Sequence, residues 1–80
     1  MVQRTTDLER QQRKEFGARL RELRKERGLS QEGLAHEAEL DRSYVGQVER
    51  GERNISLDNI YRFSRALGIS PADLFTPGPR

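Results

Sequence analysis

The stretch from residue 29 to residue 53, LSQEGLAHEAELDRSYVGQVERGER, restricts the fold more than any other part of the chain. It has room for two short helices with only a few residues between them. Ser30 precedes the first helix, and its hydroxyl can accept a free backbone N–H of the first turn, as an N-cap does. Asp41 is expected to cap the second helix, which is expected to run from about Arg42 to Arg50. The stretch therefore predicts a tight pair of short helices.

The second helix of this pair separates into an apolar and a polar face when successive residues are placed about 100° apart. Val45 and Val48 point to one side, with Tyr44 at their edge. The other side carries only hydrogen-bonding groups or no side chain at all, in Arg42, Ser43, Gly46, Gln47 and Arg50. Arginine and glutamine have forked ends that match base edges in the DNA major groove. Composition alone would also fit an ordinary helical hairpin with a solvated face, but this division next to a short crossing helix favours a helix-turn-helix.

The order and spacing of residues in this stretch resemble the Cro/repressor (XRE) type of helix-turn-helix proteins. Their pattern runs S-Q-x-x-L-A, a short turn, and a polar-led helix that ends x-E-R/N-G. The residues that fit it in register are Ser30, Gln31, Leu34, Ala35, Val45, Val48, Glu49, Arg50 and Gly51. The likeness covers residues 16–75. It implies an all-α, five-helix, lambda-repressor-like DNA-binding domain with a helix-turn-helix.

The chain divides into three expected parts. Residues 1–14 have almost no apolar periodicity and are expected to form a flexible or loosely helical N-terminal extension, which Thr6 or Asp7 can cap. Residues 15–75 are expected to form the helix-turn-helix domain. Residues 76–80 contain two prolines, which cannot continue a helix, so they are expected to form a flexible tail.

Three further helices complete the predicted domain. Counted along the whole chain, the pair described above forms the second and third helices. The first helix is expected to end near Gly28, and the fifth is expected to start at the sequence Ser70-Pro71-Ala72-Asp73. The buried stripes of the first and fourth helices are expected to be Phe16, Leu20 and Leu23, and Leu57, Ile60, Phe63 and Leu67. In the turn between the second and third helices, Glu39 stands where the family usually has glycine. The backbone there is expected to take a positive φ, at a mild cost in strain.

Composition excludes several other classes of protein. Eighty residues make one small domain, and 32% hydrophobic residues give it a thin core that oligomerisation would support. The chain has no cysteine and one histidine, His36, so neither a disulfide framework nor a metal site is expected, and no cofactor. The apolar runs are too short for a membrane span or a signal peptide, so a cytoplasmic protein is expected. No nucleophile–base pair or glycine-rich phosphate loop is present, so neither an enzyme nor a small-molecule ligand is expected.

The polar face and the family resemblance together name the residues that should contact double-stranded DNA. The expected base contacts are Arg42 and Gln47, with Ser43 second. In the family, the glutamine that opens the second helix and the loop after the third helix lie against the DNA backbone. The residues expected to set position on the phosphates are therefore Gln31, Tyr44, Arg53 and Asn54, and Arg50 suits either role.

A single reading helix covers only about four or five base pairs, so a two-fold homodimer on an inverted repeat is expected. Its two reading helices would lie one DNA turn, about 34 Å, apart. The predicted fifth helix is too short to bury both of its faces within one domain. Ile69, Leu74 and Phe75 are therefore candidates for the dimer seam, and a shared role in the seam and the core is favoured over simply closing the core of one domain.

A narrower resemblance lies in LDRSYVGQVERGERNISLDNI, which is similar to the controller proteins of restriction–modification systems. Those proteins are small stand-alone dimers that bind operators near their own promoters. The positions through which they contact DNA match Arg42, Ser43, Tyr44, Arg53 and Asn54. A general phage-type or chromosomal repressor remains open. So does an antitoxin or protein-binding adaptor on the same fold, with residues 1–14 as its candidate arm.

Overall fold

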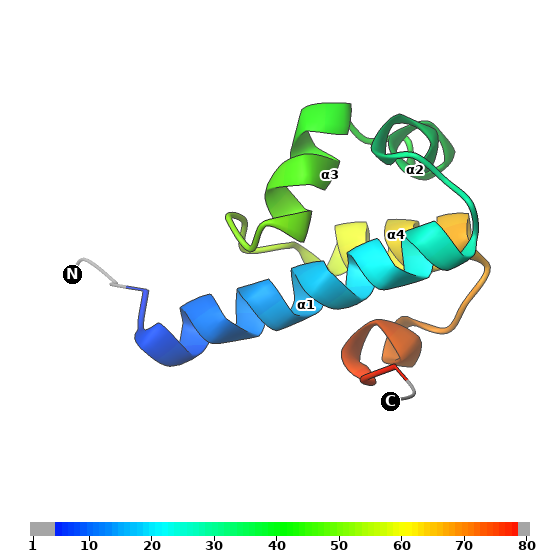
Figure 1. The fold of residues 1–80 in the computed structure, drawn as a ribbon. Coiled ribbons are helices and arrows are strands. Elements are labelled where there is room, and N and C mark those ends of the chain that lie inside the picture. Colours follow the sequence, from blue (N-terminus) through cyan, green and yellow to red (C-terminus); the bar gives the residue numbers. More distant parts are fainter. Residues whose placement is uncertain (1–4, 79–80) are drawn as a thin grey trace.

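The structure, a computed structural model, describes residues 5–78 (Figure 1). In that range it contains four α-helices and one short 3-10 helix, and no strand. The elements are α1 (Asp7–Glu26), α2 (Gln31–Ala38), α3 (Arg42–Glu49), α4 (Leu57–Leu67) and the 3-10 helix η1 (Pro71–Phe75). The all-α prediction is confirmed for these residues, but the predicted count of five helices is not, because the fifth element is a 3-10 helix. Residues 1–4 and 79–80, the outer ends of the expected extension and tail, lie outside the described residues.

The fifth element is a five-residue 3-10 helix, and both of its ends are fixed by local chemistry. The N–H of Ser70 donates to Asp73 Oδ2 at 3.1 Å, and the N–H of Ala72 donates to Ser70 Oγ at 3.3 Å, so the predicted helix start is confirmed. At the other end, Thr76 is extended, with φ −101° and ψ 122°. A residue before proline is sterically driven out of the helical region, and Pro77 follows directly. The space between these two signals holds only five residues.

Helix α1 begins earlier than the expected division of the chain between residues 14 and 15. Its N-terminus is a capping box in which the N–H of Glu9 donates to Thr6 Oγ1 at 3.1 Å and the N–H of Thr6 donates to Glu9 Oε1 at 2.9 Å. The hydrogen bond from the backbone N–H of Thr6, followed by the interaction with the Thr6 side chain, lowers the pKa of the Glu9 carboxyl. The expected division therefore falls inside a continuous 20-residue helix, whose first turns project past the other helices in Figure 1.

The core lies where α2, α3, α4 and η1 meet the C-terminal half of α1 (Figure 1). Its fully buried side chains are Leu20, Leu34, Val45, Val48, Phe63, Leu67 and Leu74. Leu57 was expected in this core and is instead 68% exposed, so that part of the predicted α4 stripe is wrong. Leu57 is the first residue of α4, and the stripe becomes buried only further along the helix, through half-buried Ile60 to Phe63. None of the helices in residues 5–78 combines the length and apolar character that a membrane span needs.

Helix α3 sits on α1 at a crossing that only glycine permits. A Cβ atom added to Gly17 would lie 2.6 Å from the carbonyl oxygen of Glu49 and closer still to that of Val48. The C-terminal end of α3 therefore rests directly on the backbone of α1. This contact fixes the position from which the polar side of α3 faces outward.

Candidate nucleic-acid interface

Helices α2 and α3 form the predicted helix-turn-helix, with a strained residue in the turn. Ser30 caps α2 by accepting a hydrogen bond from the N–H of Gly33 at 2.9 Å. Glu39 is the one non-glycine residue with a positive φ in residues 5–78, at φ 58° and ψ 44°, which confirms the expected turn conformation. Asp41 occupies the N-cap position of α3, but its side chain makes no capping hydrogen bond.

Helix α3 places its apolar and polar side chains largely as its sequence predicts. Val45 and Val48 are fully buried, while Arg42, Ser43 and Arg50 are exposed and Tyr44 and Gln47 are half-buried. The prediction that Gly46 belongs to the exposed face is wrong, because Gly46 is buried. A Cβ at Gly46 would lie 3.6 Å from Oε1 of Gln31, so it is α2 of the same chain that approaches the helix there.

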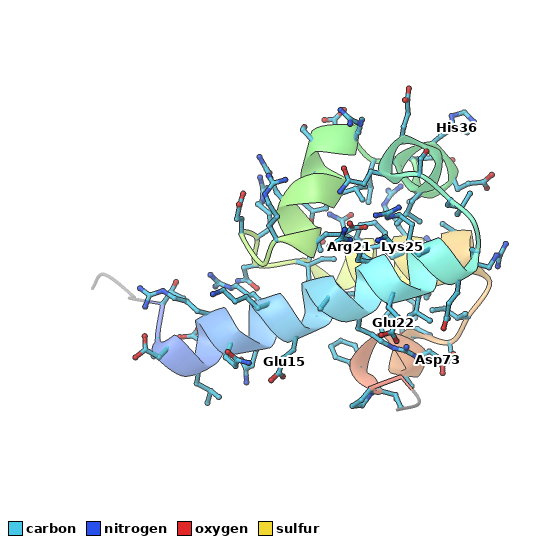
Figure 2. All side chains as sticks on the ribbon, in the orientation of Figure 1. Glu15, Arg21, Glu22, Lys25, His36 and Asp73 are labelled. Atoms are coloured by element: carbon cyan, nitrogen blue, oxygen red, sulfur yellow. The ribbon has the colours of Figure 1, made fainter. Side chains whose placement is uncertain are left out.

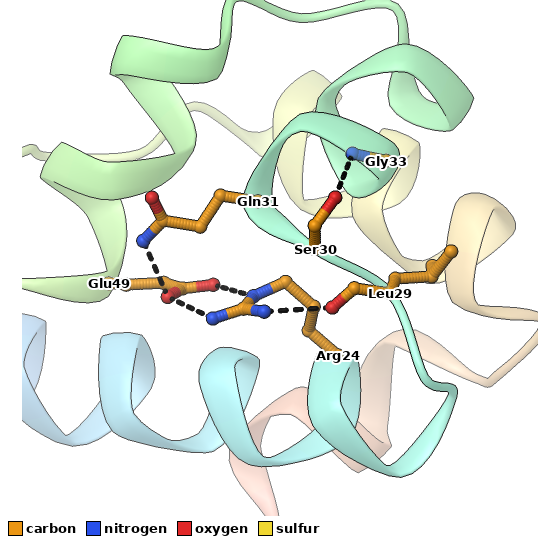
Figure 3. A network of polar contacts seen from close by, with 6 residues as sticks. All are labelled: Arg24, Leu29, Ser30, Gln31, Gly33 and Glu49. Atoms are coloured by element: carbon orange, nitrogen blue, oxygen red, sulfur yellow. Dashed lines mark hydrogen bonds and ion pairs between the residues drawn. The ribbon is translucent and has the colours of Figure 1, made fainter.

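A buried polar network joins α1 and the start of α2 to α3 (Figure 3). The guanidinium of Arg24 donates to both carboxylate oxygens of Glu49, with Nε–Oε2 at 2.6 Å and Nη2–Oε1 at 3.1 Å. Arg24 also donates to the carbonyl of Leu29 at 2.8 Å, and Gln31 Nε2 donates to Glu49 Oε1 at 3.1 Å. The side chains of Arg24 and Glu49 are only 9% and 3% exposed. Gln31 is thus held against α3 by a buried ion pair, a role for Arg24 and Glu49 that the sequence did not reveal.

A second cluster joins two residues of α3 to the loop that follows the helix. Its members are Tyr44, Gln47 and Arg53. The guanidinium carbon of Arg53 lies 4.9 Å from the centroid of the Tyr44 ring, and Arg53 Nη1 donates to Gln47 Oε1 at 3.0 Å. Asn59 of α4 donates through Nδ2 to the Tyr44 hydroxyl oxygen at 3.0 Å. The Tyr44 ring also stacks on buried Phe63, with centroids 6.5 Å apart. These contacts bring three of the predicted DNA-contacting residues together and add Asn59, which the sequence did not single out.

The remaining predicted DNA-contacting residues lie around this cluster. Arg42 and Ser43 are exposed at the N-terminal end of α3 and make no side-chain hydrogen bond to any residue in the range 5–78. Arg50 pairs with Glu52, which raises the pKa of Arg50 and lowers that of Glu52 through the hydrogen bonds between them. Asn54 is exposed in the loop after α3 and lines a small surface hollow with Arg53 and with Arg13 of α1.

The three residues predicted for a dimer seam differ in their accessibility. Leu74 is 1% exposed and fills the core, so its side chain offers almost no surface to a second copy of the chain. Ile69 is half-buried, whereas Phe75 is 64% exposed and packs on Phe16 with ring centroids 5.4 Å apart. Two further exposed apolar residues, Leu57 at 68% and Tyr61 at 46%, stand one turn apart on α4.

The described residues hold no group of three or more potential metal-ligating side chains. His36 projects from the outer side of α2, away from the other elements (Figure 2).

The helix-turn-helix family HTH_3 matches residues 20–74, which include α2, α3, α4 and most of η1. The chain belongs to the helix-turn-helix family. It is 50% identical over 60 residues to control protein C.BamHI of Bacillus amyloliquefaciens, a match that covers 74% of each chain. It is 47% identical over 62 residues to control protein C.MunI of a Mycoplasma species, covering 76% of this chain and 84% of that protein.

Solved structures in this helix-turn-helix family share the fold. The restriction–modification controller protein C.AhdI of Aeromonas hydrophila superposes with a TM-score of 0.78 at 60% sequence identity, covering 79% of this chain and 96% of that one. The predicted resemblance to controller proteins is therefore confirmed. The chain is a DNA-binding transcriptional regulator of the helix-turn-helix type, and its family is one of regulators rather than of enzymes.

Proposed function

We propose that this regulator binds an inverted-repeat operator as a homodimer and acts as the controller protein of a restriction–modification system. The names of its relatives C.BamHI, C.MunI and C.AhdI support the controller role. The DNA-binding mode is supported by the outer side of α3. Arg42 and Ser43 are exposed there, and the hydrogen bond from Arg53 holds Gln47 beside them. We expect the protein to lie in the cytoplasm, together with the DNA that it binds.

In this proposal the outer side of α3 enters the major groove. Arg42 and Gln47 contact base edges, with Ser43 in a secondary role, because arginine and glutamine can each make paired hydrogen bonds to a purine. The residues that set position on the phosphates are Gln31, Tyr44, Arg53 and Asn54, and Arg50 lies where either kind of contact is within reach. The hydrogen bond from Arg53 uses one of the two lone pairs of the Gln47 amide oxygen, so Gln47 keeps its NH₂ donor and a second acceptor position for a purine.

The homodimer places two copies of α3 about 34 Å apart, on half-sites one helical turn from each other. Exposed apolar side chains near the C-terminal half of the chain, Leu57, Tyr61 and Phe75, provide the seam. Burying them would remove apolar surface from water, which is the main driving force for association. A dimer also doubles the length of DNA that is read.

The test is a selection of binding sequences from a pool of randomised duplexes. We expect enrichment of an inverted repeat whose half-sites lie about 10 base pairs apart, centre to centre. Enrichment of an isolated half-site would contradict the dimeric mode, and no enrichment would contradict sequence-specific binding. The controller role makes a separate prediction: the selected sequence should occur upstream of the protein's own gene, next to methyltransferase and endonuclease genes.

A further inference from the structure

Glu52 is the one exposed carboxylate on α3 and the loop that follows it, among residues 42–55. This segment contains two carboxylates, Glu49 and Glu52. The side chain of Glu49 is 3% exposed and is held by Arg24, whereas that of Glu52 is 53% exposed. A negative charge here is unexpected on a surface that meets phosphates, because like charges repel.

The side chain of Glu52 binds Arg50 with two hydrogen bonds, from Arg50 Nε to Oε2 at 2.8 Å and from Nη2 to Oε1 at 3.2 Å. Residues two positions apart do not face each other on a continuous helix. They meet here because Gly51 has φ 76° and turns the chain back, and because the N–H of Glu52 donates to the carbonyl of Gln47 at 2.9 Å. A Cβ on Gly51 would lie 2.9 Å from the Cα of Lys14, so α1 holds this turn in place.

The paired guanidinium lies on the proposed DNA-binding surface. Nη1 of Arg50 is 3.2 Å from the point where a Cβ of Gly46 would stand, and Oε1 of Gln31 is 3.6 Å from the same point. Arg50 and Gln31 therefore flank the same spot on α3. Within residues 5–78, the side chain of Glu52 makes hydrogen bonds only to Arg50, so the ion pair does not join separate elements of the fold.

We propose that Glu52 competes with DNA for the guanidinium of Arg50 and so lowers the affinity of the protein for DNA. This inference rests on the proposed function, in which Arg50 contacts DNA. A carboxylate and a phosphate accept the same pair of parallel hydrogen bonds from arginine. Glu52 occupies Nε and Nη2 of Arg50, so a phosphate or a base that binds this edge of the guanidinium must displace the carboxylate, which then stands beside the DNA backbone. Glu52 is thus an affinity-setting residue for DNA binding.

The test is Glu52→Gln, measured by fluorescence anisotropy with a short random-sequence duplex. Because an exposed ion pair contributes little, the variant should bind roughly 1.4- to five-fold more tightly than the wild type. The slope of log affinity against log salt should steepen by up to about 0.9, the value for one additional neutralised phosphate. Unchanged affinity in the variant would overturn the inference while leaving DNA binding by the wild type intact.

Two further measurements distinguish competition for Arg50 from a general effect of removing one negative charge. Glu15→Gln makes the same charge change on the side of α1 that faces away from α3 (Figure 2), and it should leave affinity nearly unchanged. In an Arg50→Ala background, Glu52→Gln should give a clearly smaller gain, because it then relieves only the repulsion between the carboxylate and the DNA backbone. An equal gain in the Glu15 variant, or a full gain without Arg50, would show a general charge effect and overturn the proposal. A wild-type protein that binds no duplex would instead contradict the proposed function itself.

Discussion

The carboxylate of Glu49 accepts two hydrogen bonds from the guanidinium of Arg24, at 2.6 and 3.1 Å, although the two residues are 25 positions apart in sequence. The same carboxylate accepts a third hydrogen bond from the amide of Gln31. The ion pair therefore links the scaffold to the proposed DNA-binding surface: α1 holds α3 through Glu49, and Glu49 orients the first residue of α2 (Figure 3).

Removing one member of this pair should destabilise the fold strongly. Glu49→Leu leaves the charge of Arg24 buried without a partner, which typically costs about 3–5 kcal/mol. We expect a correspondingly lower free energy of unfolding in urea, measured by circular dichroism. Replacing both residues, with Arg24→Met and Glu49→Leu together, should recover most of that loss because apolar side chains of similar size can fill the site.

The double variant also separates stability from function. Its fold should recover, but Gln31 would have lost its acceptor and its fixed orientation. We therefore expect weaker DNA binding than in the wild type even where thermal stability is restored. Full recovery of both properties would show that the ion pair has a purely structural role.

Arg42→Ala should lower the ratio of specific to random DNA binding. One arginine–guanine contact discriminates against a wrong base by about 1–3 kcal/mol, so the ratio should fall by roughly 5- to 150-fold. The measurement is a pair of binding isotherms, one on a selected operator and one on a random duplex. An equal loss on both duplexes would make Arg42 a phosphate contact and contradict its assignment to a base.

The dimer seam can be tested by placing a charge on each exposed apolar residue. Leu57→Asp and Phe75→Asp should both shift sedimentation toward the monomer, because an unpaired charge at a buried seam is costly. Leu8→Asp is the matched control, since Leu8 is also exposed, at 67%, but lies in the first turns of α1. If only the Leu8 variant shifted sedimentation toward the monomer, the seam would lie at the N-terminal end of α1 instead.

Local rules predicted the parts of the fold that depend on neighbours in sequence. The cap at Ser30 and the helix start at Ser70 follow from the residues on either side, whereas the left-handed turn at Glu39 was expected from the family resemblance. Periodicity also separated Val45 and Val48 from Arg42, but it says nothing about where along a helix burial begins, so Leu57 was misplaced.

The parts that sequence reasoning missed depend on residues distant in sequence. Gly46, for example, is covered by Gln31 of another helix. The hydrogen bonds of Glu49 and Tyr44 reach partners on α1 and α4. None of these contacts leaves a periodic signal, so the residues expected to contact DNA could be named, while those that hold them in place could not.

Gly17→Ala should destabilise the protein by opening the crossing of α1 and α3. The added methyl group would meet the carbonyl oxygens of Val48 and Glu49, the latter at 2.6 Å, and backbone atoms cannot move aside cheaply. Overpacking of this kind costs about 1–3 kcal/mol, despite the better helix propensity of alanine.

Gly33→Ala is the matched control, because its Cβ would meet only side chains, the nearest being Ser30 Oγ at 3.3 Å. Thermal unfolding should therefore show a clear loss for the Gly17 variant and little change or a gain for the Gly33 variant. Equal stability of the two variants would show that α3 does not rest on the backbone of α1.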